Sequence, residues 1–527
     1  MIHATRNHRR HGWLATIAVT LAAIAAPVVA SPVEVVIEAD RPGATIHPNV
    51  YGQFVEHLGR GIYEGIWVGE DSSIPNTRGY RNDVLAALKD LRVPLLRWPG
   101  GCFADQYHWR DGIGPRAQRP KRVNTSWGGV IEDNAFGTHE FLDLAEMLGA
   151  EVYVNGNLGT GTPREMAEWV EYITADGQST QAELRRRNGR DKPWRLHYFA
   201  IGNEAWGCGG NMRPEYYVDL YNHYATFVKA PEDNQPKMIA SGGHGDMTEW
   251  AEAISSGVEP NWSLRLDGIS HHYYTLPNAD WEKKGAALGF DEAAWFATLR
   301  QTLLMDDYIV ANKEVLARND PDGKYGFYVD EWGTWYDTEE GDNPGFLFQQ
   351  NSLRDAVVAA LNFHIFHDHA DRVHMAVIAQ MVNVLQAMIL TDKEKMLLTP
   401  TYHAFHMYRP FHGATTLPAR VRNAPEYRHG DGAIPGISVS AARDTDGKLQ
   451  LALVNPDPGT PLTVHVAVQG GAVQRASGRL LTADAMDAHN SFAQPQAVRP
   501  RDYSVEAREG RLAIELPAKS IAVLVVE

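Results

Sequence analysis

The sequence predicts an α/β protein with a (β/α)8 TIM barrel and a C-terminal all-β sandwich. Two observations lead to this fold class. Between residues 45 and 408, short apolar segments of strand type alternate with longer segments of helical periodicity, a pattern typical of a parallel sheet covered by helices. After residue 408 the helical periodicity stops, and short alternating segments follow one another between turns rich in Gly, Pro and Asp.

The first part of the chain contains eight strand–helix units. We expect barrel strands at 45–57, 93–98, 152–155, 196–202, 237–240, 266–274, 325–330 and 373–379. The clearest helical segments are 80–91, 139–148, 214–229, 291–318 (with one break) and 352–369. Eight such units in roughly 350 residues suit one barrel with loop insertions. The polar segment 111–134, which carries Trp127, is a long loop of the kind that is usually functional.

The sandwich is expected to use strands at 436–441, 448–455, 462–468, 478–481, 512–516 and 520–526. An early strand at 33–39 has no helix after it, so we expect it to join the sandwich. The predicted domain limits are therefore 31–44 for the N-terminal strand, 45–408 for the catalytic barrel and 409–527 for the sandwich.

Residues 1–30 have the composition of an export signal. Arg6, Arg9 and Arg10 precede the apolar run 13–29, and small residues lead to a cleavage site before Ser31. The prediction is a signal peptide and an exported protein, periplasmic or extracellular. The alternative is an uncleaved anchor helix, although the run is short for a bilayer span.

The net charge of −16 argues against nucleic acid or an anionic membrane surface as a partner. The chain has 14 Trp and 21 Tyr, which suit stacking on sugar faces, although many of them will belong to the core. Cys102 and Cys208 are the only cysteines, and the sequence leaves open whether they pair.

No cofactor and no metal ion are expected. The two cysteines lack the spacing of a zinc site. Adjacent histidines at 271–272 and a group in and after the last barrel helix could suggest metal ligands, but the group falls at mixed spacings: His364, His367, His369 and His374.

Two predicted strands end in a carboxylate beside a tryptophan. Segment 198–206 ends in Asn203 and Glu204, and segment 325–332 ends in Glu331. These are barrel strands four and seven, and active sites lie at the carboxyl ends of barrel strands. Hydrolysis of a glycoside needs two facing carboxyl groups, and an amide beside one of them can donate to the sugar 2-hydroxyl. The alternative is that each glutamate forms only a surface ion pair.

Several stretches, in order, identify a known family. They are 51–60 (YGQFVEHLGR), 96–101 (LRWPGG), 202–204 (GNE) with 207–212 (GCGGNM), 272–274 (HYY), 330–332 (DEW) and 379–383 (AQMVN). The chain resembles the α-L-arabinofuranosidases of glycoside hydrolase family 51, retaining enzymes of the 4/7 barrel superfamily. The resemblance runs from about residue 51 to 408, and more loosely to the C-terminus.

The resemblance implies roles for individual residues. It makes Glu204 the acid/base and Glu331 the nucleophile. It also implies a subsite for the terminal arabinofuranose, lined by Glu56, Arg97, Asn203, Tyr274 and Gln380.

Three further residues complete the predicted pocket. Trp127 matches an aromatic residue at the pocket rim in the family, and its alternative role is a loop anchor. Cys102 stands where several relatives carry Asn; it is either a weak hydrogen-bonding group in the pocket or an inert buried residue. His272 is expected to orient Glu204 or Glu331.

The electrostatic needs of the two glutamates differ. Arg97 should hold Glu331 or Glu56 ionised, because a guanidinium lowers the pKa of a neighbouring carboxyl, although it could be only an ion pair inside the barrel. Glu204 must retain its proton near neutral pH, which requires partial removal from water.

The predicted function is a retaining, exo-acting α-L-arabinofuranosidase that releases terminal residues from arabinoxylan, arabinan and their oligosaccharides. The alternative within the same fold is a β-xylosidase or an endo-β-1,4-glucanase. An alternative of another class is a non-catalytic carbohydrate-binding protein. The family is commonly oligomeric, so a homo-oligomer is also expected, but nothing in the sequence sets its subunit count.

Overall fold

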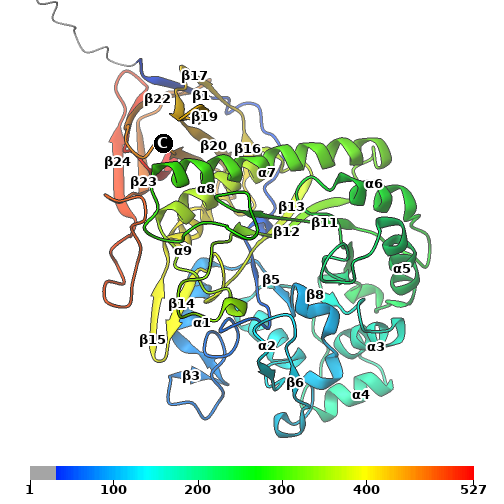
Figure 1. Ribbon diagram of the computed structural model, residues 1–527. Coiled ribbons are helices and arrows are strands. Elements are labelled where there is room, and N and C mark those ends of the chain that lie inside the picture. Colours follow the sequence, from blue (N-terminus) through cyan, green and yellow to red (C-terminus); the bar gives the residue numbers. More distant parts are fainter. Residues whose placement is uncertain (1–30) are drawn as a thin grey trace, which may run out of the picture.

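Eight parallel strands close into a barrel in the computed structural model, which describes residues 31–527 (Figure 1). The predicted leader, 1–30, lies outside the described residues. The barrel closes where the eighth strand pairs with the first, with Val377 beside Gly52. The strands are β2 (Gly52–Phe54), β5 (Leu95–Trp98), β8 (Glu151–Gly156), β9 (Tyr198–Ile201), β10 (Lys237–Ala240), β11 (Gly268–Thr275), β12 (Gly326–Thr334) and β13 (Val373–Ile378).

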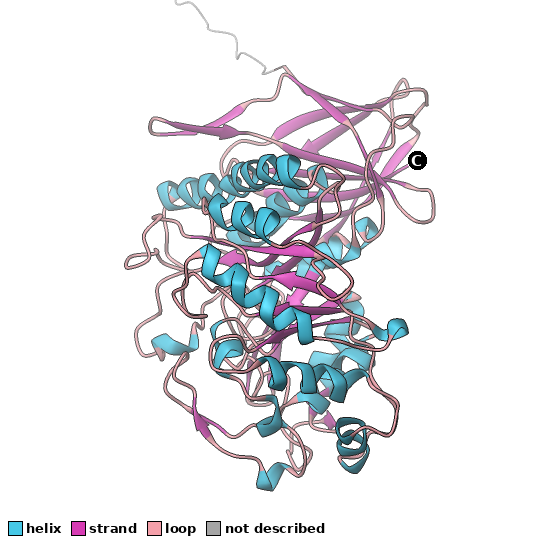
Figure 2. Cartoon of the chain, turned by 90° about the vertical axis from the view of Figure 1, so that its right-hand side faces the viewer, coloured by secondary structure: helices cyan, strands magenta, loops and turns pink. Residues whose placement is uncertain are grey.

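Helices surround the barrel strands (Figure 2). The helix predicted at 291–318 with a break is continuous, and its first turn is capped by Asp291, whose side chain accepts the N–H of Ala294 at 2.9 Å. The α-helices are α1 (Asn82–Leu91), α2 (Thr138–Leu148), α3 (Pro163–Thr174), α4 (Thr180–Arg187), α5 (Pro214–Phe227), α6 (Thr248–Gly257), α7 (Glu292–Asn319), α8 (Leu353–Asp368) and α9 (Pro400–Met407).

The C-terminal region forms two sheets that pack as a sandwich. One has the order β17 (Ala419–Arg422), β1 (Val33–Ile37), β22 (Leu462–Val468), β25 (Leu512–Leu516). The other has the order β16 (Thr415–Leu417), β20 (Ser438–Arg443), β21 (Leu449–Asn455), β26 (Ser520–Val526), β23 (Arg475–Leu481), β24 (Arg501–Glu506). The early strand β1 therefore joins the sandwich, and the predicted fold class is confirmed. The domain limits at 44/45 and 408/409 stay predictions.

Short hairpins and 3-10 turns lie in the loops. The hairpins are β3 (Asn76–Thr77) with β4 (Tyr80–Arg81), β6 (Arg122–Val123) with β7 (Ile131–Glu132), β14 (Ile389–Asp392) with β15 (Lys395–Leu398), and β18 (Glu426–His429) with β19 (Gly432–Pro435). The 3-10 turns are η1 (Pro48–Tyr51), η2 (Cys102–Gln106), η3 (Trp109–Gly112), η4 (Arg116–Gln118), η5 (Glu232–Asn234), η6 (Pro344–Phe346) and η7 (Arg409–Phe411). The predicted long loop, 111–134, thus contains a small hairpin.

Two buried histidines of α8 link the barrel to the sandwich. His364 is hydrogen-bonded to Ser438 Oγ of β20 and to the Tyr408 hydroxyl, both at 2.7 Å. His367 is bonded to Ser440 Oγ of β20 at 2.8 Å and to Tyr51 at 2.7 Å. Burial lowers the pKa of His364 to about 3, so this ring is neutral and serves as a hydrogen-bonding bridge.

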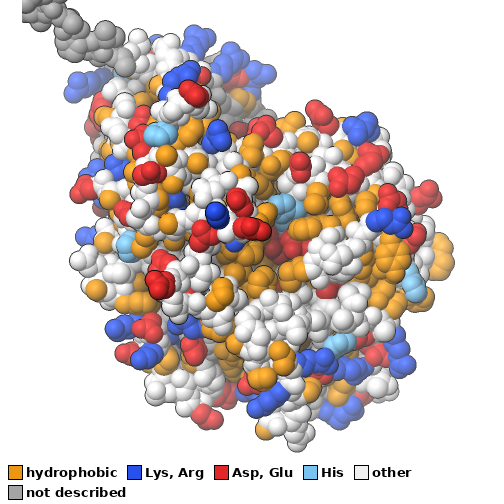
Figure 3. Space-filling model, viewed as in Figure 1, with side chains coloured by type: hydrophobic (Ala, Val, Ile, Leu, Met, Phe, Trp, Pro, Cys, Tyr) orange, Lys and Arg blue, Asp and Glu red, His pale blue; other side chains and the backbone are white. Residues whose placement is uncertain are grey.

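Charged side chains of both signs are interspersed over the face of the molecule that Figure 3 shows. Among residues 31–527, no helix combines the length and the apolar character needed to cross a membrane.

The alternating burial of β1 can be tested by placing the same polar group on each face. Val35 is fully buried between the sheets, whereas Val36 is half-buried on the other face. We expect Val35→Thr to lower the free energy of unfolding by about 1–3 kcal/mol, because its hydroxyl would be buried without a partner. Val36→Thr, the matched control, should change it by less than about 0.5 kcal/mol. Equal effects in denaturant titrations would contradict this placement of β1.

Candidate active site

A cavity of about 250 Å³ lies at the carboxyl ends of the barrel strands. Seven of the ten site residues predicted from sequence line it: Glu56, Cys102, Trp127, Glu204, Tyr274, Glu331 and Gln380. The other three, Arg97, Asn203 and His272, are buried and hydrogen-bonded to residues of the same site. The structure therefore brings all ten into one constellation.

Glu204 reaches the cavity through a sharp turn after β9. Gly202 has φ +79° and Glu204 itself has φ +42°, so both are in the left-handed region, which a non-glycine residue enters only under strong local constraint. The Glu204 carboxyl lies 2.8 Å from His272 Nδ1. Burial raises the pKa of Glu204, and the contact with His272 opposes that rise.

Glu331 is held from two sides near the end of β12. Arg97 donates to its Oε1 at 2.8 Å, and the Tyr274 hydroxyl donates to its Oε2 at 2.7 Å. One carboxyl oxygen from Glu204, one from Glu331 and a ring nitrogen of His272 all lie within 4.8 Å of one another. The two carboxyl groups therefore face each other at short range.

Arg97 lies below the cavity and is fully buried. It donates to Asn203 Oδ1 at 2.5 Å, to Asn155 Oδ1 at 3.0 Å and to the Asp330 carbonyl at 2.9 Å, besides its bond to Glu331. The sequence left open whether Arg97 serves Glu331 or Glu56, and the hydrogen bond goes to Glu331. Among the described residues the Asn203 side-chain nitrogen has no partner.

His272 lies among three carboxyl groups. Its Nδ1 lies 2.8 Å from Glu204 and 3.5 Å from Glu331, and its Nε2 lies 3.2 Å from Asp330. Burial alone would lower its pKa, but the charges of Glu331 and Asp330 and the bond to Glu204 raise the pKa to about 10. His272 is therefore an imidazolium at neutral pH.

Glu56 forms the opposite side of the cavity. It accepts hydrogen bonds from Trp127 Nε1 at 2.8 Å, Gln380 Nε2 at 3.0 Å and the Phe103 N–H at 3.2 Å. Burial, with a contribution from the charge of Glu331, raises the pKa of Glu56 to about 7. Trp127 is thus fixed at the rim by a hydrogen bond and does more than anchor its own loop.

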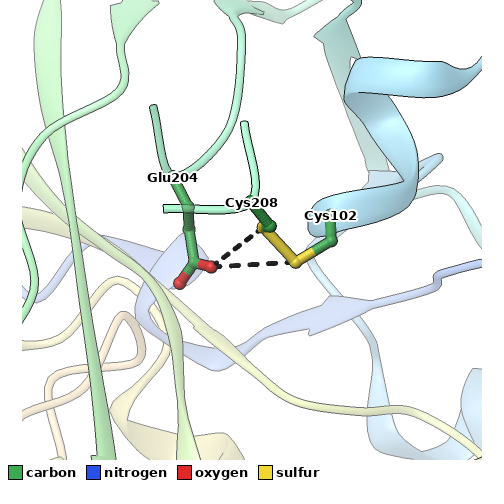
Figure 4. Close-up of side chains that lie close together, drawn as sticks. All are labelled: Cys102, Glu204 and Cys208. Atoms are coloured by element: carbon green, nitrogen blue, oxygen red, sulfur yellow. Dashed lines mark hydrogen bonds between the residues drawn. A yellow bond between two sulfur atoms is a disulfide. The ribbon is translucent and has the colours of Figure 1, made fainter. Parts of the chain in front are cut away.

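Cys102 and Cys208 form a disulfide beside Glu204 (Figure 4). Cys102 opens η2 after β5, and Cys208 lies in the loop after β9. The pairing that the sequence left open therefore joins two active-site loops.

Other residues that shape the site were not predicted from the sequence. His244, Trp281 and Trp335 line the cavity. Trp335 lies four residues after Glu331 and could have been found from that spacing, whereas Trp281 lies in a loop with no local signal. Asp105 was also missed; it is buried in η2 beneath the turn that carries Glu204.

Comparisons with known proteins agree with this geometry. Residues 87–287 match a family model described as α-L-arabinofuranosidase 1 domain, and residues 330–520 match one described as α-L-arabinofuranosidase C-terminal domain. A relative from Bacteroides ovatus, named an intracellular exo-α-L-arabinofuranosidase, is 47% identical over 93% of this chain and 95% of its own length. The chain belongs to the α-L-arabinofuranosidases of glycoside hydrolase family 51.

Solved structures of this family share the fold. The family 51 arabinofuranosidase from Xanthomonas axonopodis pv. citri is 52% identical, with a TM-score of 0.92 over 94% of this chain and all of the other. The α-L-arabinofuranosidase from Thermotoga maritima, solved as an arabinose complex, is 29% identical with a TM-score of 0.82, over 94% of this chain and 99% of the other.

One expectation about this family 51 protein is wrong. The sequence predicted export, but the Bacteroides ovatus relative is named an intracellular enzyme. The prediction relied on basic and apolar composition in residues 1–30, and such composition is not specific to cleaved signals.

Asp105 is expected to position the Glu204 turn. Its carboxylate accepts the N–H of Leu158 at 2.7 Å and those of Gly159 and Asn203 at 2.9 Å. In Asp105→Asn an amide NH₂ replaces one acceptor, and each orphaned donor costs about 1–3 kcal/mol. We expect kcat to fall about tenfold or more with little change in KM, an effect worth about 1.4 kcal/mol.

The control for Asp105 is Asp133→Asn. Asp133 also accepts a backbone N–H, from Ala135 at 2.9 Å, but it is exposed. The kcat of the Asp133→Asn variant should stay at the wild-type value. Circular dichroism should show that both variants are folded. If the folded Asp105→Asn variant kept the wild-type kcat, Asp105 would not position the Glu204 turn.

Proposed function

We propose that this family 51 protein is a retaining, exo-acting α-L-arabinofuranosidase that releases terminal arabinofuranosyl residues from arabinoxylan, arabinan and derived oligosaccharides. One observation carries the proposal: Glu204 and Glu331 present carboxyl oxygens within 4.8 Å of each other in a small cavity. Retaining glycosidases separate their carboxyl groups by roughly 5–5.5 Å, and inverting ones by roughly 6.5–9.5 Å, and the close approach of one oxygen from each glutamate fits the shorter, retaining arrangement better.

In the first step Glu331 attacks the anomeric carbon while Glu204 protonates the departing oxygen. A covalent glycosyl–enzyme forms on Glu331, and the leaving alcohol departs. In the second step the ionised Glu204 removes a proton from water, which attacks the anomeric carbon and frees Glu331. The hydrogen bonds from Arg97 and Tyr274 aim the Glu331 carboxylate, and burial favours the protonated form of Glu204.

The remaining predicted residues would hold the sugar. Glu56 and Gln380 are hydrogen-bonded to each other and line one side of the cavity, where they suit sugar hydroxyls. Asn203 would donate from its unpartnered amide nitrogen to the 2-hydroxyl. A cavity of about 250 Å³ fits one terminal residue better than an internal segment of a chain, which supports exo action.

The same fold could support a β-xylosidase or an endo-β-1,4-glucanase, but the relatives that cover most of this chain are named arabinofuranosidases and do not favour these activities. A binding protein without catalysis has no use for two facing carboxyl groups of which one, Glu204, is shifted by burial toward its protonated form. Neutral polysaccharides also suit the net charge of −16, which disfavours nucleic acid and anionic membrane surfaces.

We also expect the protein to form a homo-oligomer in solution. Light scattering, which measures the molar mass of the assembly, would check this.

The activity and the two glutamates can be tested together. Wild-type enzyme should hydrolyse an aryl α-L-arabinofuranoside, with much lower rates on an aryl β-xyloside and on carboxymethylcellulose. Glu204→Gln should lose about 10²–10⁴-fold in kcat/KM, the usual contribution of general acid–base catalysis. Glu331→Gln should lose more, because no covalent intermediate can form.

Two controls make this experiment decisive. Glu259→Gln, at an exposed loop carboxylate, should keep wild-type activity. Proton NMR of the first product should show the α-anomer. A β-anomer as first product, or no activity on the arabinofuranoside, would refute the proposal.

The imidazolium of His272 should set the alkaline limb of the pH profile. Activity needs the protonated form of Glu204, so kcat/KM falls as pH rises through the pKa of Glu204. His272 lowers that pKa, against the raising effect of burial. His272→Gln removes the positive charge, so we expect the alkaline limb to move to higher pH. A limb that stays in place or moves to lower pH would show that His272 does not act on Glu204.

A further inference from the structure

The disulfide between Cys102 and Cys208 lies beside the Glu204 carboxyl, and its two sulfurs become metal-ligand atoms when it is reduced (Figure 4). Glu204 Oε2 lies 3.3 Å from Cys208 Sγ and 3.9 Å from Cys102 Sγ. A disulfide sulfur has no hydrogen to donate, so these are close contacts that give the carboxyl no polar partner. One ligand atom from each of the three residues lies within 4.8 Å of the other two.

We propose that reduction of Cys102–Cys208 creates a binding site for a thiophilic divalent metal ion, Zn²⁺, held by both thiolates and the Glu204 carboxylate. A dithiol would supply two electrons and two protons; the S–S bond breaks, two thiols form, and the dithiol becomes a cyclic disulfide. On binding, Zn²⁺ displaces the two thiol protons into solvent. Water would complete four-coordination on the cavity side.

The observed spacing suits such a site. Bonds of about 2.3 Å to sulfur and about 2.1 Å to oxygen put each S···O edge of a tetrahedral zinc site at about 3.6 Å. In the disulfide the two distances to Glu204, 3.3 and 3.9 Å, are already close to that length, whereas the two bonded sulfurs must move apart to the roughly 3.8 Å of a tetrahedral S···S edge. The Cα atoms of Cys102 and Cys208 are 5.4 Å apart, so rotation about their Cα–Cβ bonds brings the freed sulfurs to ligand positions.

Solvent access and ligand chemistry favour a metal at Cys102, Cys208 and Glu204 over one at Glu204, His272 and Glu331. Cys208 is exposed, and Cys102 and Glu204 line the cavity, so reductant and metal have a path. Soft thiolates select zinc over Ca²⁺ or Mg²⁺. The other cluster, Glu204 with His272 and Glu331, would offer an imidazolium, which has no free lone pair and repels a cation.

The consequence for catalysis rests on the proposed role of Glu204. A carboxylate bound to Zn²⁺ is unavailable for proton transfer, so the reduced enzyme should be inhibited by zinc while the oxidised enzyme is not. Metal binding itself does not depend on that role, so binding and inhibition test the two proposals separately.

The chain has only these two cysteines, which makes the test specific. Full-length protein is reduced with a dithiol, desalted without oxygen, and titrated with Co²⁺ and then Zn²⁺; oxidised protein is the matched control. We expect thiolate-to-cobalt charge-transfer absorption and one tightly bound Zn²⁺ in the reduced sample alone. Its activity should fall at least tenfold with zinc and return with a chelator. Absence of the absorption in the reduced protein would overturn the site.

Variants assign the ligands. Reduced Cys208→Ser should bind zinc more than about 100-fold more weakly, since even outer partners of a metal site are worth 10–100-fold. Reduced Glu204→Gln should keep the cobalt absorption and bind zinc more weakly. Zinc binding to reduced wild type without inhibition would overturn the part of the proposal that makes Glu204 a ligand. Full activity of metal-free Glu204→Gln would instead refute its acid/base role and leave the metal site standing.

Discussion

Two buried cations among four carboxyl groups, three of them buried and Glu204 half-buried, determine the electrostatics of this site. Arg97 and His272 supply the positive charges; Glu56, Glu204, Asp330 and Glu331 are the carboxyl groups. An uncompensated charge is very costly away from water, so at most two of the four carboxyl groups can be matched by a full positive charge. Asp330 is one of the two carboxyl groups that are matched by a positive charge. Burial alone would raise its pKa, but the contacts with Arg97 and His272 lower it. Glu331 receives the direct hydrogen bond from Arg97.

The remaining two carboxyl groups are those whose pKa values rise, Glu56 to about 7 and Glu204 also upward. The hydrogen bond from Arg97 to Glu331, together with the burial that raises the pKa of Glu204 against the effect of His272, is consistent with different roles for the facing glutamates. The member bonded to the guanidinium is suited to attack, and the member next to an uncharged disulfide is suited to carry a proton. This division depends on His272 as well as Arg97, because without the imidazolium a third carboxyl group would have to be neutralised.

The sequence predicts this arrangement only to the extent that backbone topology decides it. Strand ends of a closed barrel must meet at one rim, so Glu204 and Glu331 could be assigned to one site from their positions after apolar segments. The family resemblance supplied Glu56, Arg97, Tyr274 and Gln380, whose positions at or just beyond strand ends agree with that site. Backbone topology does not decide the contacts between side chains. The choice of Glu331 over Glu56 as the partner of Arg97 depends on rotamers, and the pairing of Cys102 with Cys208 depends on how two loops fold. Trp281 comes from a loop that no periodic pattern positions. The export prediction was wrong because basic and apolar composition in residues 1–30 is not specific to cleaved signals, and the relative from Bacteroides ovatus is named an intracellular enzyme.

The sandwich supports the catalytic strand although it contributes no lining residue to the cavity. It covers the outer face of α8, which is buried nearly all around and is hydrogen-bonded to β20 through His364 and His367. At its other end, α8 presents Asp355, which accepts hydrogen bonds of 2.7 Å from the hydroxyls of Thr334 and Tyr336. Thr334 ends β12, three residues after Glu331, so a continuous set of buried contacts runs from the sandwich through α8 to the strand that carries Glu331. Since a misplacement of about 1 Å can cost a large part of a catalytic rate, these contacts give the sandwich a structural route by which it can affect the placement of Glu331.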